Sequence, residues 1–282
     1  TSQTSKKELA RMMVGREVIF TSLRKPKPPG DLIFQVRNLN LRDREGQLRL
    51  SDINLAVRES EIVGIAGVEG NGQLALVNTI MGRMEAQSGE ITCKGEAIQN
   101  ASILERRKML AFVSQDRSRL SASLNASITD NTIMTHHRLN PFLTEWGGRL
   151  LDPQSARGFT QKIEESYSVD MGSPEDLFRS LSGGNQQKVI LGRELTLDKP
   201  FLLLDQPTRG LDVGSIEYVH RQILAMRDEG HAILLISSDL DELFRIADRI
   251  LVLHRGRIVG RRRVEKTDLE EIGALMLEGG TA

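Results

Sequence analysis

The pattern of apolar and polar positions divides the first part of the chain into short strands and one helix. Apolar residues alternate with polar ones over 32–41 and 50–57, which is typical of half-buried strands. The apolar run 61–67 indicates a buried strand that leads into a glycine-rich loop, and a helix is expected directly after it, over 73–82. A hairpin that turns at Lys94 and Gly95 is expected over 89–98. This part of the chain is therefore predicted to be strand-rich.

The later part of the chain follows a βαβ pattern. Apolar strands over 201–205 and 231–238 flank a helical segment over 216–230, which implies a parallel sheet. Another hairpin is expected over 250–260. Between about 118 and 180 the chain is polar and has helical patches, so a helical insertion is predicted there.

Composition narrows the class of protein. The 282 residues include 39% hydrophobic residues, enough for a substantial core. The 38 Lys and Arg balance the 38 Asp and Glu, so no global field favours nucleic acid, and no nucleic-acid partner is expected. The single cysteine, Cys93, fits a reducing compartment. No apolar run approaches the roughly 20 residues of a membrane helix, so the chain itself is not expected to cross a membrane.

Residues 67–74 read GVEGNGQL and resemble a phosphate-binding loop of the form G-x-x-x-x-G-K-[ST]. Gln73 stands where the lysine belongs, and Leu74 stands where the hydroxyl belongs. Alone, the loop is equally well explained as a strand-to-helix turn that binds nothing. The candidate nucleotide-binding residues are Gly67, Val68, Glu69, Gly70, Asn71, Gly72, Gln73 and Leu74, together with Gln115.

Two later motifs support a nucleotide site. The apolar strand 201–205 ends in Asp205, where a P-loop ATPase holds a magnesium-coordinating carboxylate. Residues 181–188 read LSGGNQQK, in which Ser182 is a natural helix N-cap, while Gly183 and Gly184 leave backbone N–H groups open to an anion. This second motif predicts a second phosphate-reading element.

Together these motifs resemble those of ATP-binding-cassette (ABC) ATPases over most of residues 31–264. LSGGN matches the family's signature, Gln115 its Q-loop, and Asp212 the loop that faces a partner cassette. The resemblance implies an α/β P-loop NTPase fold of the ABC-ATPase type, with a RecA-like parallel-sheet core, an antiparallel β subdomain and an inserted helical subdomain. It also implies ATP and Mg²⁺ as cofactors, with Asp205 and Gln115 as metal ligands. Cassettes of this family pair head to tail, with each ATP between the glycine loop of one and the signature of the other.

A narrower resemblance is carried by residues 8–18, the glycine loop and PTRGLDVGSIEYVH, residues 207–220. They look like the second cassette of fused ATPases that serve simple-sugar and nucleoside importers, and the Asn-Gly-Gln form of the loop looks closer to the nucleoside branch. The implied organisation is a linker from an upstream cassette (1–30), an ABC ATPase domain (31–264) with a helical subdomain at about 118–180, and a C-terminal helix (265–282). The implied partners are the upstream cassette in the same polypeptide, transmembrane permease subunits and an extracytoplasmic substrate-binding protein, with the chain at the cytoplasmic face of the membrane.

The chain departs from the family in the glycine-loop half of the site. An ion pair at about 4 Å is worth about 4 kcal/mol at an effective dielectric near 20 before desolvation, and neutral Gln73 cannot supply it. Leu74 offers a metal ion nothing, and Gln206 stands where a water-polarising glutamate is usual. Ser238 replaces the switch histidine, and Arg44 replaces the aromatic residue that stacks on adenine. The candidate catalytic residues are Gln206, Asp205 and Ser238, degenerate in cis, and Ser182, Gly183 and Gly184 of the signature, acting in trans.

The departures fall on the glycine-loop half of the site and leave the signature intact. This asymmetry predicts that the chain completes the active ATP site of a partner cassette and that the isolated chain hydrolyses ATP weakly or not at all. Two alternatives stay open: a regulatory nucleotide-binding module that never hydrolyses ATP, and a soluble ABC ATPase acting on nucleic acid or ribosomes. His136 and His137 are interpreted as surface histidines rather than a metal pair. Phe142 and Trp146, in the predicted insertion, are expected either to pack internally or to dock on a membrane partner.

Overall fold

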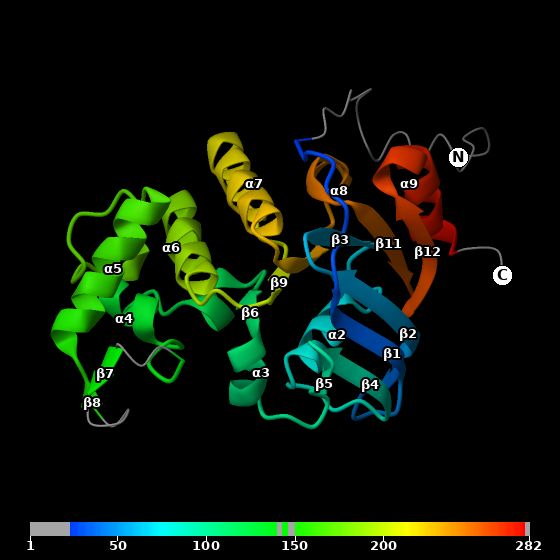
Figure 1. Cartoon of the computed structure of the whole chain (residues 1–282), viewed down its shortest axis with the longest axis horizontal. Helices are drawn as coiled ribbons and strands as arrows, with labels where there is room; N and C mark the ends of the chain where they lie inside the picture. The colour runs from blue at the N-terminus through cyan, green and yellow to red at the C-terminus, as the bar shows by residue number, and fades with distance from the viewer. Residues whose placement is uncertain (1–22, 140–142, 146–149, 280–282) are drawn as a thin grey trace. The chain divides into compact units, whose positions relative to one another are not determined.

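The computed structural model describes residues 23–139, 143–145 and 150–279 (Figure 1). Phe142, Trp146 and most of the predicted linker 1–30 lie outside these residues. The chain forms two compact units. Their bounds are Thr1–Met109, Pro200–Leu203 and Leu224–Ala282 for the first unit, and Leu110–Lys199 and Leu204–Ile223 for the second unit.

An antiparallel sheet in the first unit has the strand order β2-β1-β4-β5. Its strands are β1 (Leu32–Arg42), β2 (Leu48–Arg58), β4 (Ser88–Cys93) and β5 (Glu96–Ala97). The predicted alternation is confirmed, because Phe34 and Val36 of β1 are buried while their neighbours are less so. The predicted β4–β5 hairpin is also confirmed, since Lys94 and Gly95 both take the positive φ that a two-residue turn requires.

The first unit also holds neighbouring strands of a six-stranded sheet, in the order β12-β11-β3-β10-β9, although the last residues of β9 belong to the second unit. Its strands are β3 (Glu61–Ala66), β9 (Phe201–Asp205), β10 (Ala232–Ile236), β11 (Arg249–His254) and β12 (Arg257–Arg263). The strand β3 pairs in parallel with β10 and β11, and all six residues of β3 are buried. The predicted strand–helix–strand order is confirmed, because the helix Val213–Asp228 lies between β9 and β10 in the chain and the two strands are neighbours in the sheet. The predicted 250–260 hairpin is confirmed by the antiparallel pair of β11 and β12.

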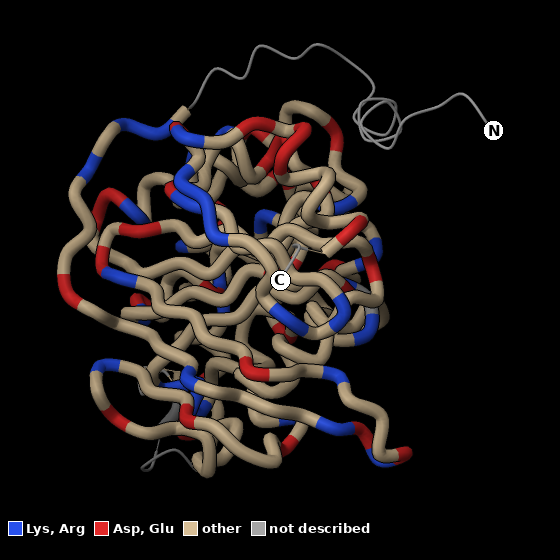
Figure 2. Tube along the Cα trace, turned by 90° about the vertical axis from the view of Figure 1, so that its right-hand side faces the viewer, with Lys and Arg blue, Asp and Glu red and all other residues tan. Residues whose placement is uncertain are grey.

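Helices surround these sheets in the first unit. They are α2 (Gln73–Ile80), α3 (Ile103–Met109), α8 (Leu240–Ile246) and α9 (Leu269–Glu278), with a 3₁₀ turn at Val264–Lys266. Asp239 caps α8 by accepting a hydrogen bond from the Asp241 N–H, which explains why acidic residues gather at that helix start. Both the Lys and Arg residues and the Asp and Glu residues are spread over many segments of the trace (Figure 2).

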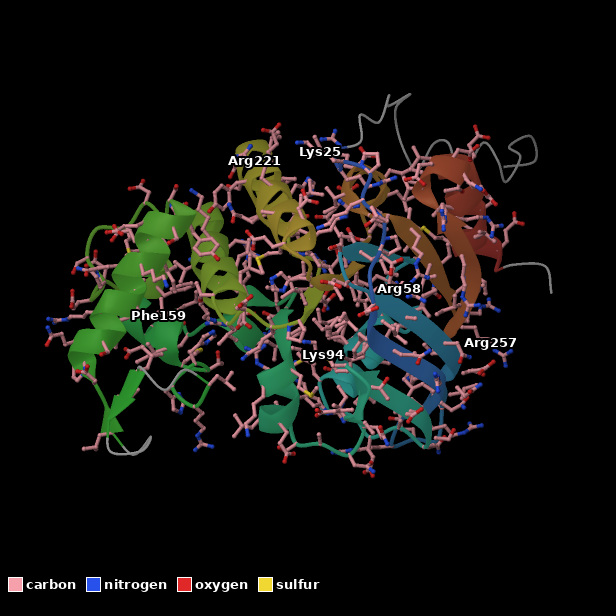
Figure 3. All side chains as sticks on the ribbon, in the orientation of Figure 1. Lys25, Arg58, Lys94, Phe159, Arg221 and Arg257 are labelled. Carbon is pink, nitrogen blue, oxygen red and sulfur yellow. The ribbon has the colours of Figure 1, made fainter. Side chains whose placement is uncertain are left out.

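The second unit is mainly helical. It contains β6 (Leu110–Val113), a wide turn at Arg117–Ser121, α4 (Ile128–Ile133), α5 (Pro153–Tyr167), a 3₁₀ turn at Phe178–Ser180, α6 (Gly183–Leu195) and a strand pair formed by β7 (Thr144–Glu145) and β8 (Leu150–Leu151). Helices α4, α5 and α6 lie side by side and pack on one another (Figure 1). Phe159, labelled in Figure 3, packs against a buried cluster that includes Ile133 and Leu143. The helix α7 (Val213–Asp228) is shared between the two units.

The interpretation of His136 as a surface residue is wrong. Its side chain is 0% exposed, and its Nε2 donates to the Arg193 carbonyl at 2.6 Å, while its Nδ1 lies 2.8 Å from the Thr135 hydroxyl. The misreading arose because α4 ends at Ile133, so the following turns carry this ring inward.

Among the residues that the structure describes, no helix is both long and apolar enough to span a bilayer.

Candidate functional site

The glycine loop connects β3 to α2 in the first unit. Gly70 and Gly72 adopt φ of 93° and 112°, which a residue with a Cβ rarely adopts. Gly72 precedes α2 without a side-chain cap, and the first turn of α2 holds no acidic residue. The start of α2 therefore has the backbone geometry and the dipole sign that suit an anion.

The loop is held in place by the β11–β12 turn. The side-chain oxygen of Asn71 accepts a hydrogen bond from the Arg255 N–H at 3.1 Å, and the Asn71 carbonyl accepts one from the Gly256 N–H at 2.8 Å. The Asn71 N–H donates to the Val68 carbonyl at 3.1 Å. Asn71 thus shapes the loop through both its backbone and its side chain.

The side chain of Gln73 contacts the backbone of the glycine loop that precedes it. Its Nε2 donates to the Val68 carbonyl at 3.0 Å, and a Cβ added to Gly67 would lie only 2.6 Å from that nitrogen. Leu74 is 51% exposed, and Val68 is 39% exposed. The loop therefore keeps its glycine geometry, but no ammonium or hydroxyl group stands at positions 73 and 74.

Ser238 follows the end of β10, and the glycine loop follows the end of β3. These two strands pair in parallel, with Ile236 opposite Ile65, and the Ser237 N–H donates to the Ile65 carbonyl at 3.2 Å. Ser238 therefore lies at the same sheet edge as the start of the loop. Arg44 lies exposed in the turn between β1 and β2.

The two predicted metal ligands come together in the second unit. Asp205, at the end of β9, is 3% exposed, and its burial raises its pKa to about 6, although a hydrogen bond from the Gln115 N–H and the charge of Arg209 oppose that rise. Arg209 also donates to the Gln115 side-chain oxygen at 3.4 Å. Gln206 takes a positive φ of 52°, a strained conformation for a residue with a side chain. Asp205 is therefore ionised above about pH 6.

The signature motif forms the start of α6, also in the second unit. The Ser182 hydroxyl caps the helix by accepting a hydrogen bond from the Asn185 N–H at 3.3 Å, as the sequence predicts. The N–H groups of Gly183 and Gly184 donate no backbone hydrogen bond within the part of the chain that the structure describes. Ser182 and Gly183 are exposed. The signature is thus preformed, open and accessible.

Asp212 and Ser215 lie against the signature. Asp212 accepts hydrogen bonds from the Ser215 N–H at 3.0 Å and from the Ser215 hydroxyl at 2.7 Å, and these bonds lower the pKa of Asp212. A Cβ on Gly184 would collide with the Ser215 hydroxyl, so any other residue there would require that hydroxyl to move. The next residue, Val213, is 74% exposed.

A buried polar network behind the signature was not predicted from the sequence. The Glu194 carboxylate accepts a hydrogen bond from the Phe112 N–H of β6 at 3.2 Å and pairs with the Arg193 Nε at 3.2 Å. Arg193 also donates to the Asn131 carbonyl at 2.7 Å, and both charged side chains are about 2% exposed. The signal in the sequence was a pair of charged residues in an otherwise apolar helical stretch, VILGREL. The network joins α6 to β6 and α4.

The residues present fit the cofactors that the resemblance implies. The exposed α6 start offers a phosphate its open N–H groups, and the α2 start offers its uncapped first turn without a cation. Mg²⁺ is usually held by one or two carboxylates together with phosphate and water, and Asp205 with Gln115 supplies such a set. In the described residues no group of three or more His, Cys, Asp and Glu could hold a metal without a nucleotide.

Comparison with known proteins identifies the family. A family model described as "ABC transporter" matches residues 50–209. The nucleoside import ATP-binding protein NupA of Lactococcus lactis subsp. cremoris is 37% identical over 274 residues, which cover 96% of this chain and 53% of that protein. The glucose import ATP-binding protein TsgD13 of Haloferax volcanii is 39% identical over 289 residues, which cover 100% of this chain and 51% of that protein.

This chain therefore spans about half the length of the curated relatives it matches. Among solved structures, a nucleotide-free ATP-binding cassette from an ABC transporter superposes with a TM-score of 0.70 at 21% identity, covering 86% of this chain and 95% of that one. The predicted α/β ABC-ATPase fold is confirmed by this likeness. The chain belongs to the ABC transporter family, as an ATPase domain homologous to sugar and nucleoside import ATP-binding proteins.

Proposed function

We propose that this chain is the energy-coupling cassette of an importer for simple sugars or nucleosides, and that its signature completes the active ATP site of a partner cassette. The observation that carries the proposal is the contrast between two helix starts. The α6 start is capped by Ser182 and exposed, whereas the α2 start carries the neutral side chain of Gln73, whose Nε2 donates to the Val68 carbonyl. The half-site at the α6 start can therefore receive a phosphate, whereas the half-site at the α2 start lacks the cation that would bind one.

The partners follow from the same proposal. The names of these two relatives concern import of nucleosides and of glucose, and each relative is about twice as long as this chain. A second cassette upstream in the same polypeptide, permease subunits in the membrane and an extracytoplasmic binding protein would complete the importer. The chain would then lie at the cytoplasmic face of the membrane.

The chain's own residues would divide the work. Bound MgATP would supply the phosphoryl group that is transferred to water, and ATP-driven closure of the paired cassettes would move the transmembrane subunits. Gly183 and Gly184 would donate their N–H groups to a phosphate held by the partner, and Ser182 would orient them. In its own site, Gln206 cannot accept a proton, and the loss of general-base assistance costs about 10²- to 10⁴-fold in rate.

The test measures magnesium-dependent ATP hydrolysis by this chain alone and by the polypeptide that joins it to the upstream cassette. The isolated chain should turn over weakly or not at all, whereas the joined protein should be active. Ser182→Arg should abolish that activity because the side chain blocks the signature. Ser166→Arg, on the exposed surface of α5, is the matched control and should leave it unchanged. Robust hydrolysis by the isolated chain would refute the proposal.

A second candidate, a regulatory module that never hydrolyses ATP in any complex, is favoured by Gln73 and Gln206. It predicts that the joined protein with an intact signature is as active as the Ser182→Arg variant. The same assay therefore separates the two functions.

A further inference from the structure

Arg117 lies against the signature, although it belongs to a different segment of the second unit. Its Nη1 donates to the Gly183 carbonyl at 3.0 Å. A Cβ added to Gly183 would be 3.5 Å from that nitrogen, and a Cβ added to Gly210 would be 3.5 Å from Nη2. The guanidinium is thus placed between the first glycine of α6 and the loop that carries Asp212.

Arg117 has no carboxylate partner in the described part of the chain. Its hydrogen bond to Gly183 goes to a neutral carbonyl, and a guanidinium carries five N–H donors, of which this bond uses one. The residue is half-buried, so its charge is less screened than that of a fully exposed side chain. Arg117 is therefore not paired with a carboxylate, although the Asp212 carboxylate lies near Gly184 at the same helix start.

The backbone of Gly183 and Gly184 leaves two further donors open at the same place, and the first turn of α6 contains no acidic residue. A charged group with planar, forked donors matches the geometry of phosphate and carboxylate oxygens. Signature residues of this family face a nucleotide held by a partner, so the cation and the open N–H groups would face the same phosphate.

We infer that Arg117 is a nucleotide-contacting residue of the signature half-site, which donates to the terminal phosphate of ATP held by the partner cassette. This inference rests on the proposed function. Arg117 would supply in trans part of the positive charge at the composite site, and its bond to the Gly183 carbonyl would hold the signature loop toward that phosphate.

The experiment compares ATP and ADP affinities of the joined two-cassette protein by competition against a fluorescent nucleotide. Arg117→Ala should weaken ATP binding about tenfold or more, the loss expected for one charge-assisted hydrogen bond, and should leave ADP binding unchanged because ADP lacks the terminal phosphate. Arg117→Lys should recover part of the ATP affinity. Arg119→Ala is the matched control, because Arg119 lies on the same turn, is exposed and makes no side-chain hydrogen bond or ion pair among the described residues.

The outcomes separate the inference from the function on which it rests. If Ser182→Arg abolishes hydrolysis but Arg117→Ala binds ATP like the wild type, the Arg117 inference fails and the proposed function stands. If Ser182→Arg leaves hydrolysis intact, the proposed function fails. Equal losses of ATP and ADP affinity in Arg117→Ala, with no recovery by lysine, would assign Arg117 only to shaping Gly183 and would overturn the inference. A thermal melt within about 2 °C of the wild type excludes misfolding as the cause.

Discussion

The side-chain amide of Gln73 donates to the carbonyl of Val68, five residues earlier, at 3.0 Å. This bond places a neutral group over a loop whose glycines retain the positive φ of a phosphate-binding turn. The backbone geometry of the loop therefore suits a phosphate, whereas the side chain at position 73 supplies no positive charge to bind one. Restoring a cation at position 73 is the most direct way to find out whether the geometry alone still suits a nucleotide.

Gln73→Lys is expected to raise the ATP affinity of the isolated chain by about tenfold or more. An ammonium beside a phosphate is worth about 4 kcal/mol at an effective dielectric near 20, and about 1.4 kcal/mol suffices for tenfold after desolvation. Binding of a fluorescent ATP analogue measures the change. Gln47→Lys adds the same charge in the exposed β1–β2 turn and should have no effect. If both variants bind equally, the loop is a turn and not a phosphate site.

Asp205→Asn is expected to stabilise the nucleotide-free chain at pH 8. Burial raises the pKa of Asp205 from 3.8 to about 6, so the folded state binds a proton more tightly than the unfolded state does. The resulting penalty is absent below about pH 4, grows as the pH rises and is complete above about pH 6, where it amounts to about 3 kcal/mol.

Thermal melts in a chelator, at pH 8 and at pH 4, check this prediction. The melting temperature of Asp205→Asn should exceed that of the wild type at pH 8 and equal it at pH 4. Asp170→Asn, at an exposed position in the same unit, should match the wild type at both pH values. A larger difference at pH 4 than at pH 8 would contradict the assigned direction of the shift.

Cys93 is expected to resist thiol reagents while the chain is folded. It is buried in β4, and burial raises its pKa to about 11. At pH 8 only about a thousandth of the thiol is ionised, and the thiolate is the reactive form. Labelling with a chromogenic disulfide should be slow in buffer and fast in denaturant. Fast labelling of the folded chain would show that β4 opens readily.

Glu194→Ala is expected to lower the free energy of unfolding by about 3–5 kcal/mol, because it leaves the buried Arg193 charge and the Phe112 N–H without this partner. Glu194→Gln keeps an acceptor oxygen for Phe112 and should cost less. Urea unfolding measures both. Glu165→Ala, on the exposed side of α5, should change the free energy by less than about 0.5 kcal/mol. Equal effects of the Glu194→Ala and Glu165→Ala variants would show that Glu194 does not stabilise the fold through this network.

Local pattern was sufficient for the strands β1 and β3 and for the cap of α6. The alternation over 32–41 and the apolar run 61–67 became β1 and β3 because side-chain periodicity reports which face a strand buries. The Ser182 cap was predictable because a cap concerns residues only three apart. Missing functional groups, such as the lysine absent at Gln73, are also properties of the sequence alone.

Tertiary structure decided which residues act together. The bond between Arg117 and Gly183 joins positions 66 residues apart, and the bond between Phe112 and Glu194 joins positions 82 apart. His136 was misread for the same reason, since the Arg193 carbonyl that accepts a hydrogen bond from its ring lies 57 residues away in the sequence. Burial and charge pairing arise from packing between distant segments, and local periodicity carries no information about them. The sequence by itself therefore determined the strands, the helices and the motifs, whereas the folded chain alone decided where each charge lies and what it contacts.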